Sequence, residues 1–568
     1  MDSSRVLLAV ILSIVLVVAY QELVLKRFFP PPTQQQQEAA EKARAKTEQE
    51  QAQANGMPAS PGVSAPEAGA SAAAAGESGI QSAPIASAGS VPEKTVEVDS
   101  DLYEAVFTTR GARLKSFVLN KYRTTSDKKS PPYEMVQMSR GGHLPLGAVI
   151  ARGGEVFDDR DVMYETSAPA QIKTTAGGDA TAVFTGKTAD GLTITKTFSF
   201  KPSSYVFSMD VATAGGAAAS QLGVAMSQPL TAHEGFRDIP ELQYDIDGKA
   251  NSYTETKLKK GVQPVGGTIT FAGFGDKYFL AAFLPQSPTA GRLVMAYTGD
   301  EAIARLLFDG ASKIHSEVYM GPKLLETLEG VNPALQKSID FGIFGILAIV
   351  FLRTLKLFHY VTPNYGVDII LVTVLIRIAF LPLSIRGQRS MMKMQRLQPQ
   401  IQRLRDKYKD NNEALQKEMV DLYKRNHVNP LGGCAPMALQ LPIFIGLYEA
   451  LLNSIELRQA PFVGWISDLS APECLPISWL PRLPFMNCHG LPVMVLLMGA
   501  TSFLQQYMTP AQVDPNQQRM MMLTPLIFTI MFINFPAGLV LYYFSSNLLG
   551  IIQQYFLNRE FQQLPPAS

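Results

Sequence analysis

Apolar residues gather in long uninterrupted runs near the start of the chain and throughout its last third. The run at residues 367–383, VDIILVTVLIRIAFLPL, carries a single arginine, Arg377. At roughly 1.5 Å of rise per residue, a helix crossing a hydrocarbon core of about 30 Å would place this arginine near the midplane. A charge there costs at least about 2.5–3.5 kcal/mol on insertion scales, so it usually serves a function. The alternative is an arginine that is paired with a carboxylate inside an ordinary helix bundle.

Residues 95–330 follow a different pattern, in which apolar and polar residues alternate with a period of two. The clearest stretch is LTITKTFSF at residues 192–200, which follows an Asp-Gly turn. Further strands are predicted at residues 103–108, 112–119, 205–211, 279–284, 293–298 and 314–320. No long amphipathic helix intervenes, which predicts a β-sandwich. His233 and Glu234 could serve sugar chemistry, but a solvated loop explains them better, and the domain shows no catalytic constellation.

The first 94 residues predict an anchor and a tether. Residues 1–28 contain an apolar run at 6–20, and no A-x-A-like cleavage site follows it. This favours an uncleaved signal anchor with a cytoplasmic N-terminus over a cleaved signal peptide. Residues 29–94 are rich in Pro, Gln, Ala, Ser and Gly and have almost no aromatics, so they predict a disordered periplasmic tether.

Residues 338–360 contain an apolar run of twelve residues, 341–352, which is too short to span. An amphipathic helix lying in the membrane interface fits this segment better. The segment after the arginine helix, 386–429, has eleven Lys/Arg against five Asp/Glu, an excess typical of short cytoplasmic loops. Its apolar spacing predicts an antiparallel helical hairpin at 386–428, with a kink or a new start at Pro399. Its basic residues either form a solvated surface whose charge only determines the membrane topology, or form a binding surface for ribosomal RNA or anionic lipid.

The last third predicts an intramembrane core at residues 361–560. Its expected spans are 366–385, 430–455, 490–507, 519–535 and 538–557, with an outer loop at 456–489 and a tail at 561–568. With the N-terminal anchor this makes six spans and places both termini in the cytoplasm. Asp368, nine residues before Arg377 in the same helix, should point to the opposite side and is a poor partner. In the other spans Glu449 is the nearest acidic candidate and lies close to a membrane end, which weakens the paired-arginine alternative.

Polar residues are frequent inside the predicted spans and should converge with Arg377 on a wet interior surface, because hydrocarbon satisfies no hydrogen bonds. They are Gln440, Gln505, Gln506, Thr524, Thr529, Asn534, Tyr542, Tyr543, Ser545, Ser546 and Asn547, while Thr373 and Ser384 share the arginine's own helix face. The net charge of +1 excludes a global basic field for nucleic acid. Three cysteines and no His/Cys cluster indicate neither a disulfide scaffold nor a metal site.

The last third contains several distinctive motifs, namely Asn429-Pro-Leu-Gly-Gly-Cys434 with Pro436, Gln440 and Pro442-Ile-Phe444, then Leu457-Arg-Gln-Ala-Pro-Phe462, Trp465 with Asp468-Leu-Ser470, and Phe535-Pro-Ala-Gly-Leu539 with Tyr542. Together these motifs resemble the signature of the YidC/Oxa/Alb family of membrane protein insertases. The match covers about residues 361–557. The anchor, tether and β-domain agree with the Gram-negative form of the family in layout.

The resemblance implies a multi-domain membrane protein with six transmembrane α-helices, a periplasmic all-β supersandwich of galactose-mutarotase type without that activity, and a cytoplasmic helical hairpin. Members insert and help fold integral inner-membrane proteins, alone or with the Sec translocon (SecYEG, SecDF), through a hydrophilic groove closed toward the periplasm. By motif position, Arg377 would be the groove arginine, with Thr373 four residues before it in the same helix and Tyr542 and Tyr543 on the last helix facing that region. Gln440 and Ser546 are assigned to the groove as polar residues inside the spans. The implied partners are nascent membrane proteins, the Sec translocon, the ribosome and membrane lipids, with no catalytic residue, cofactor, metal or small-molecule substrate.

Two features depart from the usual family pattern. The chain stops at residue 568 without a basic tail, so ribosome docking would rest on the hairpin residues Arg389, Lys393, Arg396, Arg403, Arg405, Lys407 and Lys409. The outer loop carries an insertion between Cys474 and Cys488, and both should face the oxidising side. A disulfide between them is therefore expected.

Two other functions remain open on the sequence. A polytopic transporter could use a midplane arginine, although the paired broken helices of inverted repeats are not evident. A membrane-anchored periplasmic enzyme would need a catalytic cluster in the β-domain.

Overall fold

The computed structural model describes residues 83–562, with short gaps. The gaps fall at residues 86, 88–91, 128, 138–141, 153–154, 175–177, 217–218, 231–238, 287–288, 299–300, 410, 427, 429–434, 478–489 and 510–514. The predicted anchor, most of the tether, Cys434, Cys488 and the end of the tail lie outside the described residues.

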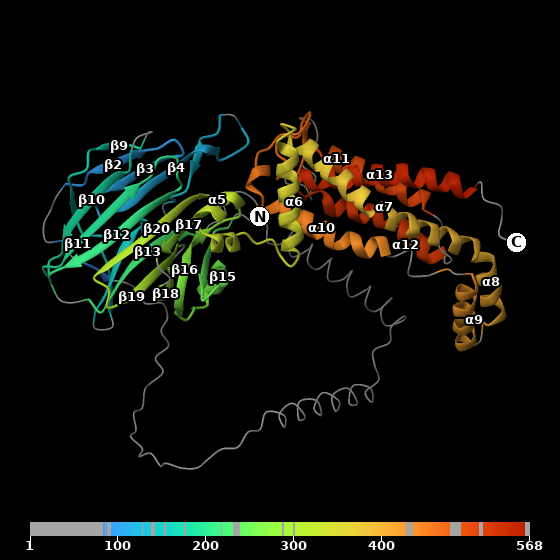
Figure 1. The fold of residues 1–568 in the computed structure, drawn as a ribbon, viewed down its shortest axis with the longest axis horizontal. Coiled ribbons are helices and arrows are strands. Elements are labelled where there is room, and N and C mark those ends of the chain that lie inside the picture. Colours follow the sequence, from blue (N-terminus) through green and yellow to red (C-terminus); the bar gives the residue numbers. More distant parts are fainter. Residues whose placement is uncertain are drawn as a thin grey trace, which may run out of the picture. The chain divides into compact units, whose positions relative to one another are not determined.

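The described β-strands of residues 83–322 form two sheets, one of fifteen strands and one of five (Figure 1). The larger sheet contains β1 (Ala83–Pro84), β6 (Gly147–Arg152), β7 (Glu155–Asp158), β8 (Tyr164–Thr166), β10 (Ala180–Lys187), β11 (Thr193–Phe200), β12 (Val206–Ala214), β13 (Gln221–Pro229), β14 (Glu241–Ile246), β15 (Lys249–Tyr253), β16 (Val265–Gly275), β17 (Phe279–Pro285), β18 (Thr289–Thr298), β19 (Glu301–Asp309) and β20 (Lys313–Pro322). The smaller sheet contains β2 (Thr95–Asp99), β3 (Tyr103–Thr108), β4 (Arg113–Arg123), β5 (Pro132–Glu134) and β9 (Gln171–Lys173).

The two sheets pack through aromatic side chains on their facing surfaces. Phe107 of β3 lies 4.7 Å from Phe198 of β11, measured between ring centroids, and Phe117 of β4 lies 6.3 Å from Phe207 of β12. In β11 every second residue is buried, as the period-two pattern predicts. The all-β prediction is therefore confirmed. One boundary differs, because β1 lies within the predicted tether and pairs in parallel with β7.

A buried ion network connects the two sheets. Lys196 of β11 and Arg113 of β4 approach Asp159, with Nζ–Oδ2 and Nη2–Oδ1 distances of 2.7 and 3.0 Å. Arg113 also pairs with Asp158, and Tyr164 donates to Asp159 at 2.8 Å. Burial lowers the pKa of Lys196 to about 8, although Asp159 opposes this shift. Such a network is costly to break, because removing one member leaves other buried charges uncompensated.

The helices follow the β-strands in the chain, apart from α4 (Glu255–Lys259). They are α5 (Leu325–Val331), η2 (Pro333–Ser338), α6 (Gly345–His359), α7 (Tyr365–Arg396), α8 (Gln398–Lys407), α9 (Asn412–Arg425), α10 (Ala435–Asn453), η4 (Ile455–Leu457), α11 (Val493–Met508), α12 (Pro515–Phe532) and α13 (Ala537–Gln562). Between α10 and α11, β21 (Leu475–Pro476) pairs with β22 (Gly490–Leu491).

The helix α7 begins at an Asn364 cap, whose side chain accepts from the backbone N–H of Gly366. It continues past Pro382 to Arg396, so the predicted span 366–385 and the first part of the predicted hairpin form one helix. Pro382 removes one backbone donor without ending the helix. The helix ends at Arg396, and α8 begins at Gln398 with Pro399 in its first turn. Among the described residues, α7 alone is long and apolar enough to cross a membrane, while α11 and part of α12 are shorter apolar helices.

The corner between α6 and α7 is held by a buried carboxylate. Asp368 is fully buried, receives a hydrogen bond from Thr362 and lies 2.8 Å from Nδ1 of His359. Asp368 thus has its partners at this corner and does not contact Arg377. The helix α6 leaves apolar residues such as Ile346 and Val350 exposed, in agreement with the amphipathic prediction.

The helices α8 and α9 pack on each other around a small apolar core, within the segment for which a hairpin was predicted. Leu397 and Ile401 pack there with Val428 and Leu422. The Asn411 side chain caps α9 by accepting from the N–H of Ala414 at 3.0 Å. We call this side of the bundle the hairpin end and the opposite side, where residues 454–476 lie, the loop end.

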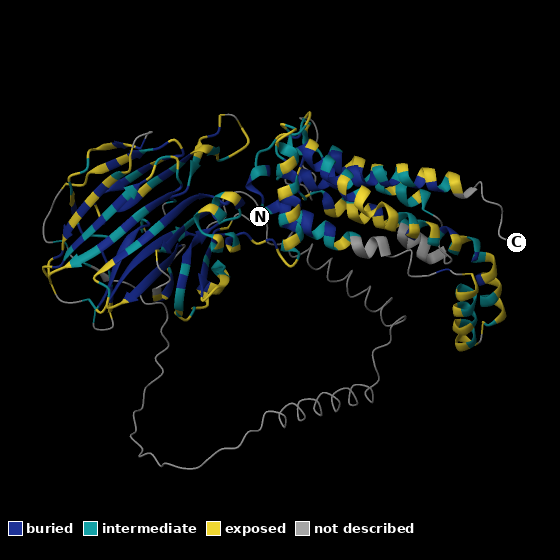
Figure 2. Ribbon diagram, viewed as in Figure 1, coloured by how far each residue is buried: buried dark blue, intermediate teal, exposed yellow. Residues whose placement is uncertain are grey.

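The described residues of the loop end tie several helix termini together. The N–H groups of Ala537 and Gly538, which start α13, donate to the carbonyls of Ala471 and Leu469. The buried carboxylate of Glu473 accepts from the N–H of Met494 at 2.6 Å and from the Trp465 indole at 2.7 Å. The first turns of α11 and α13 are thereby capped by one loop. Elsewhere the core helices expose many apolar side chains, as lipid-facing helices do (Figure 2).

Candidate functional site

The central feature of the bundle is the contact between Arg377 on α7 and Ser546 on α13. Nε of Arg377 donates to the Ser546 hydroxyl at 3.0 Å, and Nη2 donates to the same hydroxyl at 2.8 Å and to the Ser546 carbonyl at 2.6 Å. No carboxylate contacts the guanidinium among the described residues. The positive charge is therefore held by uncharged oxygens and is not neutralised, which contradicts the paired-arginine alternative and agrees with the expectation drawn from the sequence.

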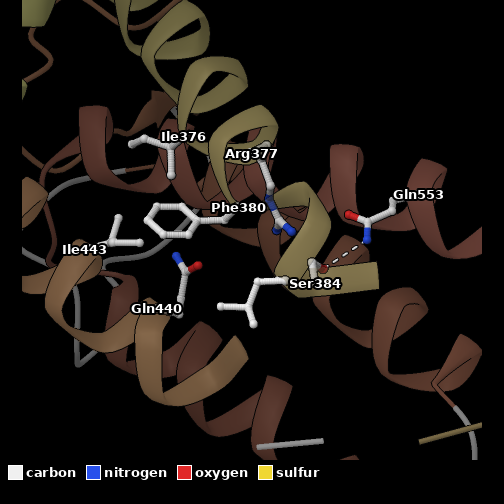
Figure 3. Close-up of a pocket in the computed structure, with 8 residues that line it drawn as sticks. Ile376, Arg377, Phe380, Ser384, Gln440, Ile443 and Gln553 are labelled. Carbon is white, nitrogen blue, oxygen red and sulfur yellow. Dashed lines mark hydrogen bonds between the residues drawn. The ribbon is translucent and has the colours of Figure 1, made fainter. Parts of the chain in front are cut away.

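A pocket opens beside this arginine (Figure 3). Its residues on α7 run from Ile376 to Ser384, which is from the arginine toward the hairpin end. It is lined by Ile376, Arg377, Phe380, Leu383, Ser384, Gln440, Ile443 and Gln553. Figure 3 shows Arg377 on α7 and Gln440 on α10 approaching it from opposite sides. Its volume of about 50 Å³ is enough for a few water molecules. The pocket thus combines an apolar wall with polar groups from three helices.

The polar lining continues from the pocket toward the hairpin end. Gln553, two turns after Ser546 on α13, donates to the Ser384 hydroxyl at 2.9 Å and to Oε1 of Gln388 at 3.4 Å. Further along, Arg389 pairs with Glu560 at 2.9 Å. Polar side chains therefore follow the contact between α7 and α13 from Arg377 to the end of the bundle.

On the other side of the pocket, toward the loop end, aromatic side chains fill the bundle. Phe532 of α12 lies 5.9 Å from Phe444 of α10 and 5.4 Å from Tyr543 of α13, measured between ring centroids. Phe535 continues the cluster toward Tyr448 at 5.5 Å. The polar lining is thus limited to the middle of the bundle and the hairpin side.

The structure brings together only part of the predicted groove. Gln440 lines the pocket and donates to the Tyr542 hydroxyl at 2.7 Å. Tyr543 faces the aromatic cluster, with its ring perpendicular to that of Phe444. Thr373 is fully buried and donates to the Ile369 carbonyl of its own helix at 2.7 Å, so it does not line the pocket.

Other polar residues of the spans stabilise helix packing. Asn547 donates to the Ser502 hydroxyl on α11 at 2.7 Å, and Gln554 donates to the Thr509 hydroxyl at 3.3 Å. The helix α13 therefore carries two polar faces, one toward α7 and one toward α11. Thr529 donates to the Pro525 carbonyl within α12. The expectation that all these groups converge on Arg377 is too broad.

Sequence reasoning missed Gln553 and Gln388 as members of the polar lining. Their positions carried a usable signal, because Gln553 lies seven residues after Ser546 and so projects from nearly the same face of α13. Phe380, Leu383 and Ile443 could not be assigned in this way, since apolar residues occur on every face of these helices.

The basic hairpin residues are mostly exposed. Those with exposed side chains are Arg389, Lys393, Arg403, Lys407 and Lys409, while Arg396 and Arg405 are half-buried. Arg389 pairs with Glu560 and Lys409 lies 3.7 Å from Asp406, so part of this charge is compensated. Cys474 is disulfide-bonded. Because Cys488 lies outside the described residues, the pairing of these two cysteines stays a prediction.

Comparisons with known proteins cover both halves of the chain. A family model described as "60Kd inner membrane protein" matches residues 357–564, and one described as "YidC periplasmic domain" matches residues 95–353. A solved structure titled "Active YidC insertase crystal structure with the first transmembrane domain resolved" is 18% identical, covers 83% of this chain and 95% of its own, and has a TM-score of 0.34.

Curated relatives are similar over most of their length. The "Membrane protein insertase YidC" of Citrifermentans bemidjiense is 35% identical over 479 residues, which are 82% of this chain and 86% of the relative. The protein of the same name from Pelobacter propionicus is 34% identical over 85% of this chain and 90% of its own. Two family models and relatives of this similarity support the insertase function over the transporter alternative. The chain belongs to the YidC family of membrane protein insertases.

Proposed function

We propose that the pocket beside Arg377 is the groove through which this insertase receives the polar segment of a client membrane protein. The main support for the proposal is the guanidinium in the middle of α7, which contacts no carboxylate among the described residues and whose hydrogen bonds there all go to Ser546. Such a residue is expensive in a membrane and can bind carboxylate or carbonyl oxygens of a passing chain. Gln440, Ser384 and Gln553 would supply further hydrogen bonds along the way.

The mechanism needs no covalent chemistry. A polar client tail that crosses lipid leaves its backbone groups and charges without partners. A wet groove that reaches halfway through the bilayer shortens this crossing, and Arg377 offers its positive charge and the two N–H groups of Nη1 at the inner end. The client's apolar segment then partitions into lipid, which drives release. No cofactor or small-molecule substrate enters this scheme.

The charge of the hairpin supports one orientation of the protein in the membrane. We place the hairpin end in the cytoplasm, because its basic excess is typical of cytoplasmic loops. The loop end and the β-domain then face the periplasm, in a multi-pass inner-membrane protein of six spans with both termini cytoplasmic. The aromatic cluster and the loop that caps α11 and α13 would close the groove on the periplasmic side.

Partners follow from this orientation as further parts of the proposal. Nascent membrane proteins are the clients. The exposed cations of α8 and α9 are available to the ribosome or to anionic membrane lipids. The Sec translocon (SecYEG, SecDF) is the partner for clients with larger translocated segments.

The proposal predicts where a client tail can be captured. A photo-crosslinking amino acid at Ser384, which lines the pocket, should crosslink to the polar tail of a stalled single-span client. The matched control places the same photo-crosslinking amino acid at position 378. Ile378 is 61% exposed on α7 and lies away from the pocket, so a crosslinker there should not reach the tail. Equal crosslinking from both positions, or crosslinking from residue 378 alone, would contradict the groove assignment. Gel electrophoresis of the irradiated complexes provides the measurement.

A further inference from the structure

The contact between Arg377 and the Ser546 carbonyl depends on the residue one turn later, Gly550. Side chains on a helix tilt toward its N-terminus, so the side chain at position i+4 covers the carbonyl of residue i. Gly550 has no side chain, and it leaves the Ser546 carbonyl accessible from the side. Arg377 uses this access, since its Nη2 donates to that carbonyl at 2.6 Å.

The space over Gly550 is occupied from two other helices. A Cβ atom added at this buried glycine would lie 3.3 Å from Nη2 of Arg377, which belongs to α7. It would lie 2.7 Å from Nε2 of Gln505, which belongs to α11. The missing side chain thus allows an arginine from one neighbouring helix and an amide from the other to meet on the surface of α13.

The two groups bring more donors than the protein uses there. Nε and Nη2 of Arg377 bond to Ser546, and no hydrogen bond is recorded for Nη1 within the described part of the chain. Gln505 uses its backbone carbonyl to accept from Thr509, and among the described residues its side-chain amide has no recorded partner. A site with converging donors and few acceptors is suited to an incoming oxygen atom.

We propose that Arg377, Gln505 and Gly550 form a notch that binds a carbonyl or carboxylate oxygen of the client's polar segment. Gly550 is a positioning residue, because its missing side chain lets the guanidinium of Arg377 lie against α13. Gln505, on α11, is a second hydrogen-bond donor. The inference deepens the proposed function and rests on it, because it assumes that Arg377 meets the client.

The test compares two clients that differ only by Asp or Asn at one position of the tail. The ratio of their insertion rates measures recognition of the carboxylate, whereas general damage to the bundle lowers both rates together. The full-length protein is reconstituted in liposomes as wild type, Gly550→Ala, Gln505→Leu, Arg377→Ala and Gly499→Ala. Gly550→Ala should fold, since alanine is a better helix former than glycine. Gly499→Ala is the packing control, because its Cβ would meet Thr529 and not the arginine.

We expect Gly550→Ala and Gln505→Leu to lower insertion of the Asp client by roughly threefold to tenfold, the range for one hydrogen bond, and to move the ratio toward one. Gly499→Ala should leave the ratio at its wild-type value. If Arg377→Ala changes the ratio and the other two variants do not, the notch is wrong and the groove stands. If Arg377→Ala changes neither rate nor ratio, the proposed function itself fails.

Discussion

Replacing Arg377 by alanine should reduce integration of a client with a short polar tail by at least about tenfold, while the protein still folds and reaches the membrane. The side chain supplies a charge and several donors to the client, and hydrogen bonds to charged groups contribute about 1.5–3 kcal/mol each. Folding should tolerate the change, since it removes a charge from the bundle and, among the described residues, takes hydrogen bonds from Ser546 alone. The Ser546 carbonyl lies inside α13, so the backbone of that helix can still pair it. Pulse-labelling in cells depleted of their own insertase measures the integrated fraction.

Two variants serve as controls for this result. Arg377→Lys keeps the positive charge but loses the planar fork of donors, so its activity should fall between wild type and alanine. Ile378→Ala changes the next residue, which is exposed away from the pocket, and should leave integration unchanged. If the Arg377→Ala variant integrated the client as well as the wild type at equal protein level, the groove assignment would be contradicted.

Replacing Lys196 by methionine should destabilise the β-domain by about 3–5 kcal/mol, the usual cost of breaking a buried ion pair from one side. The lysine approaches Asp159 at 2.7 Å, and its Nζ also donates to the carbonyls of Gly111 and Leu146 at 2.6 and 3.0 Å. Its loss removes one of the two cations that face the buried Asp159 and takes this donor from the carbonyls of Gly111 and Leu146. Urea-dependent proteolysis of the β-domain in the purified protein measures the change.

Lys201→Met is the matched control, because Lys201 is exposed just after β11. A second check is pH. Burial lowers the pKa of Lys196 to about 8 from an ordinary value of 10.5, so the unfolded chain binds more protons between these values. The contribution of this residue to stability should therefore rise with pH from about 8 to 10.5. Equal loss of stability in both variants, or no widening of the difference above pH 8, would contradict this account.

Much of the architecture was predictable because it rests on periodicity. The alternation in β11 predicted a half-buried strand, and the run around Arg377 predicted the long helix α7. Helix ends were less accurate. The helix α7 runs on to Arg396 because Pro382 lies within it without breaking it, whereas the sequence suggested a boundary near residue 385.

The sequence indicated the residues around Arg377, but it did not indicate which other residues line the pocket. Arg377, Ser546 and Gln440 are where the sequence indicated, since a charge and amides inside apolar runs are conspicuous. Thr373 was assigned to the groove because it lies on the same face of the helix as Arg377. In the structure this threonine is buried, and its hydroxyl donates to the Ile369 carbonyl of the same helix. Helix periodicity predicts the direction in which a side chain projects, but it does not predict which neighbouring segment packs against that side chain.

The buried network of the β-domain carried a signal that the sequence analysis did not use. Lys196 occupies an inward position of the alternating strand β11, between two buried residues of the same face. A lysine at such a position needs a buried partner. Its partner Asp159 is far away in the sequence, so only the packing of the two sheets identifies it.

The central claim is that this chain by itself moves a client into the membrane through the groove beside Arg377. The most direct measurement reconstitutes the purified protein in liposomes, adds a small single-span client and scores protection of the client from external protease. The account predicts clear protection with the wild type and protection near the level of empty liposomes with Arg377→Ala. Protection by the wild type no greater than that of empty liposomes would contradict it.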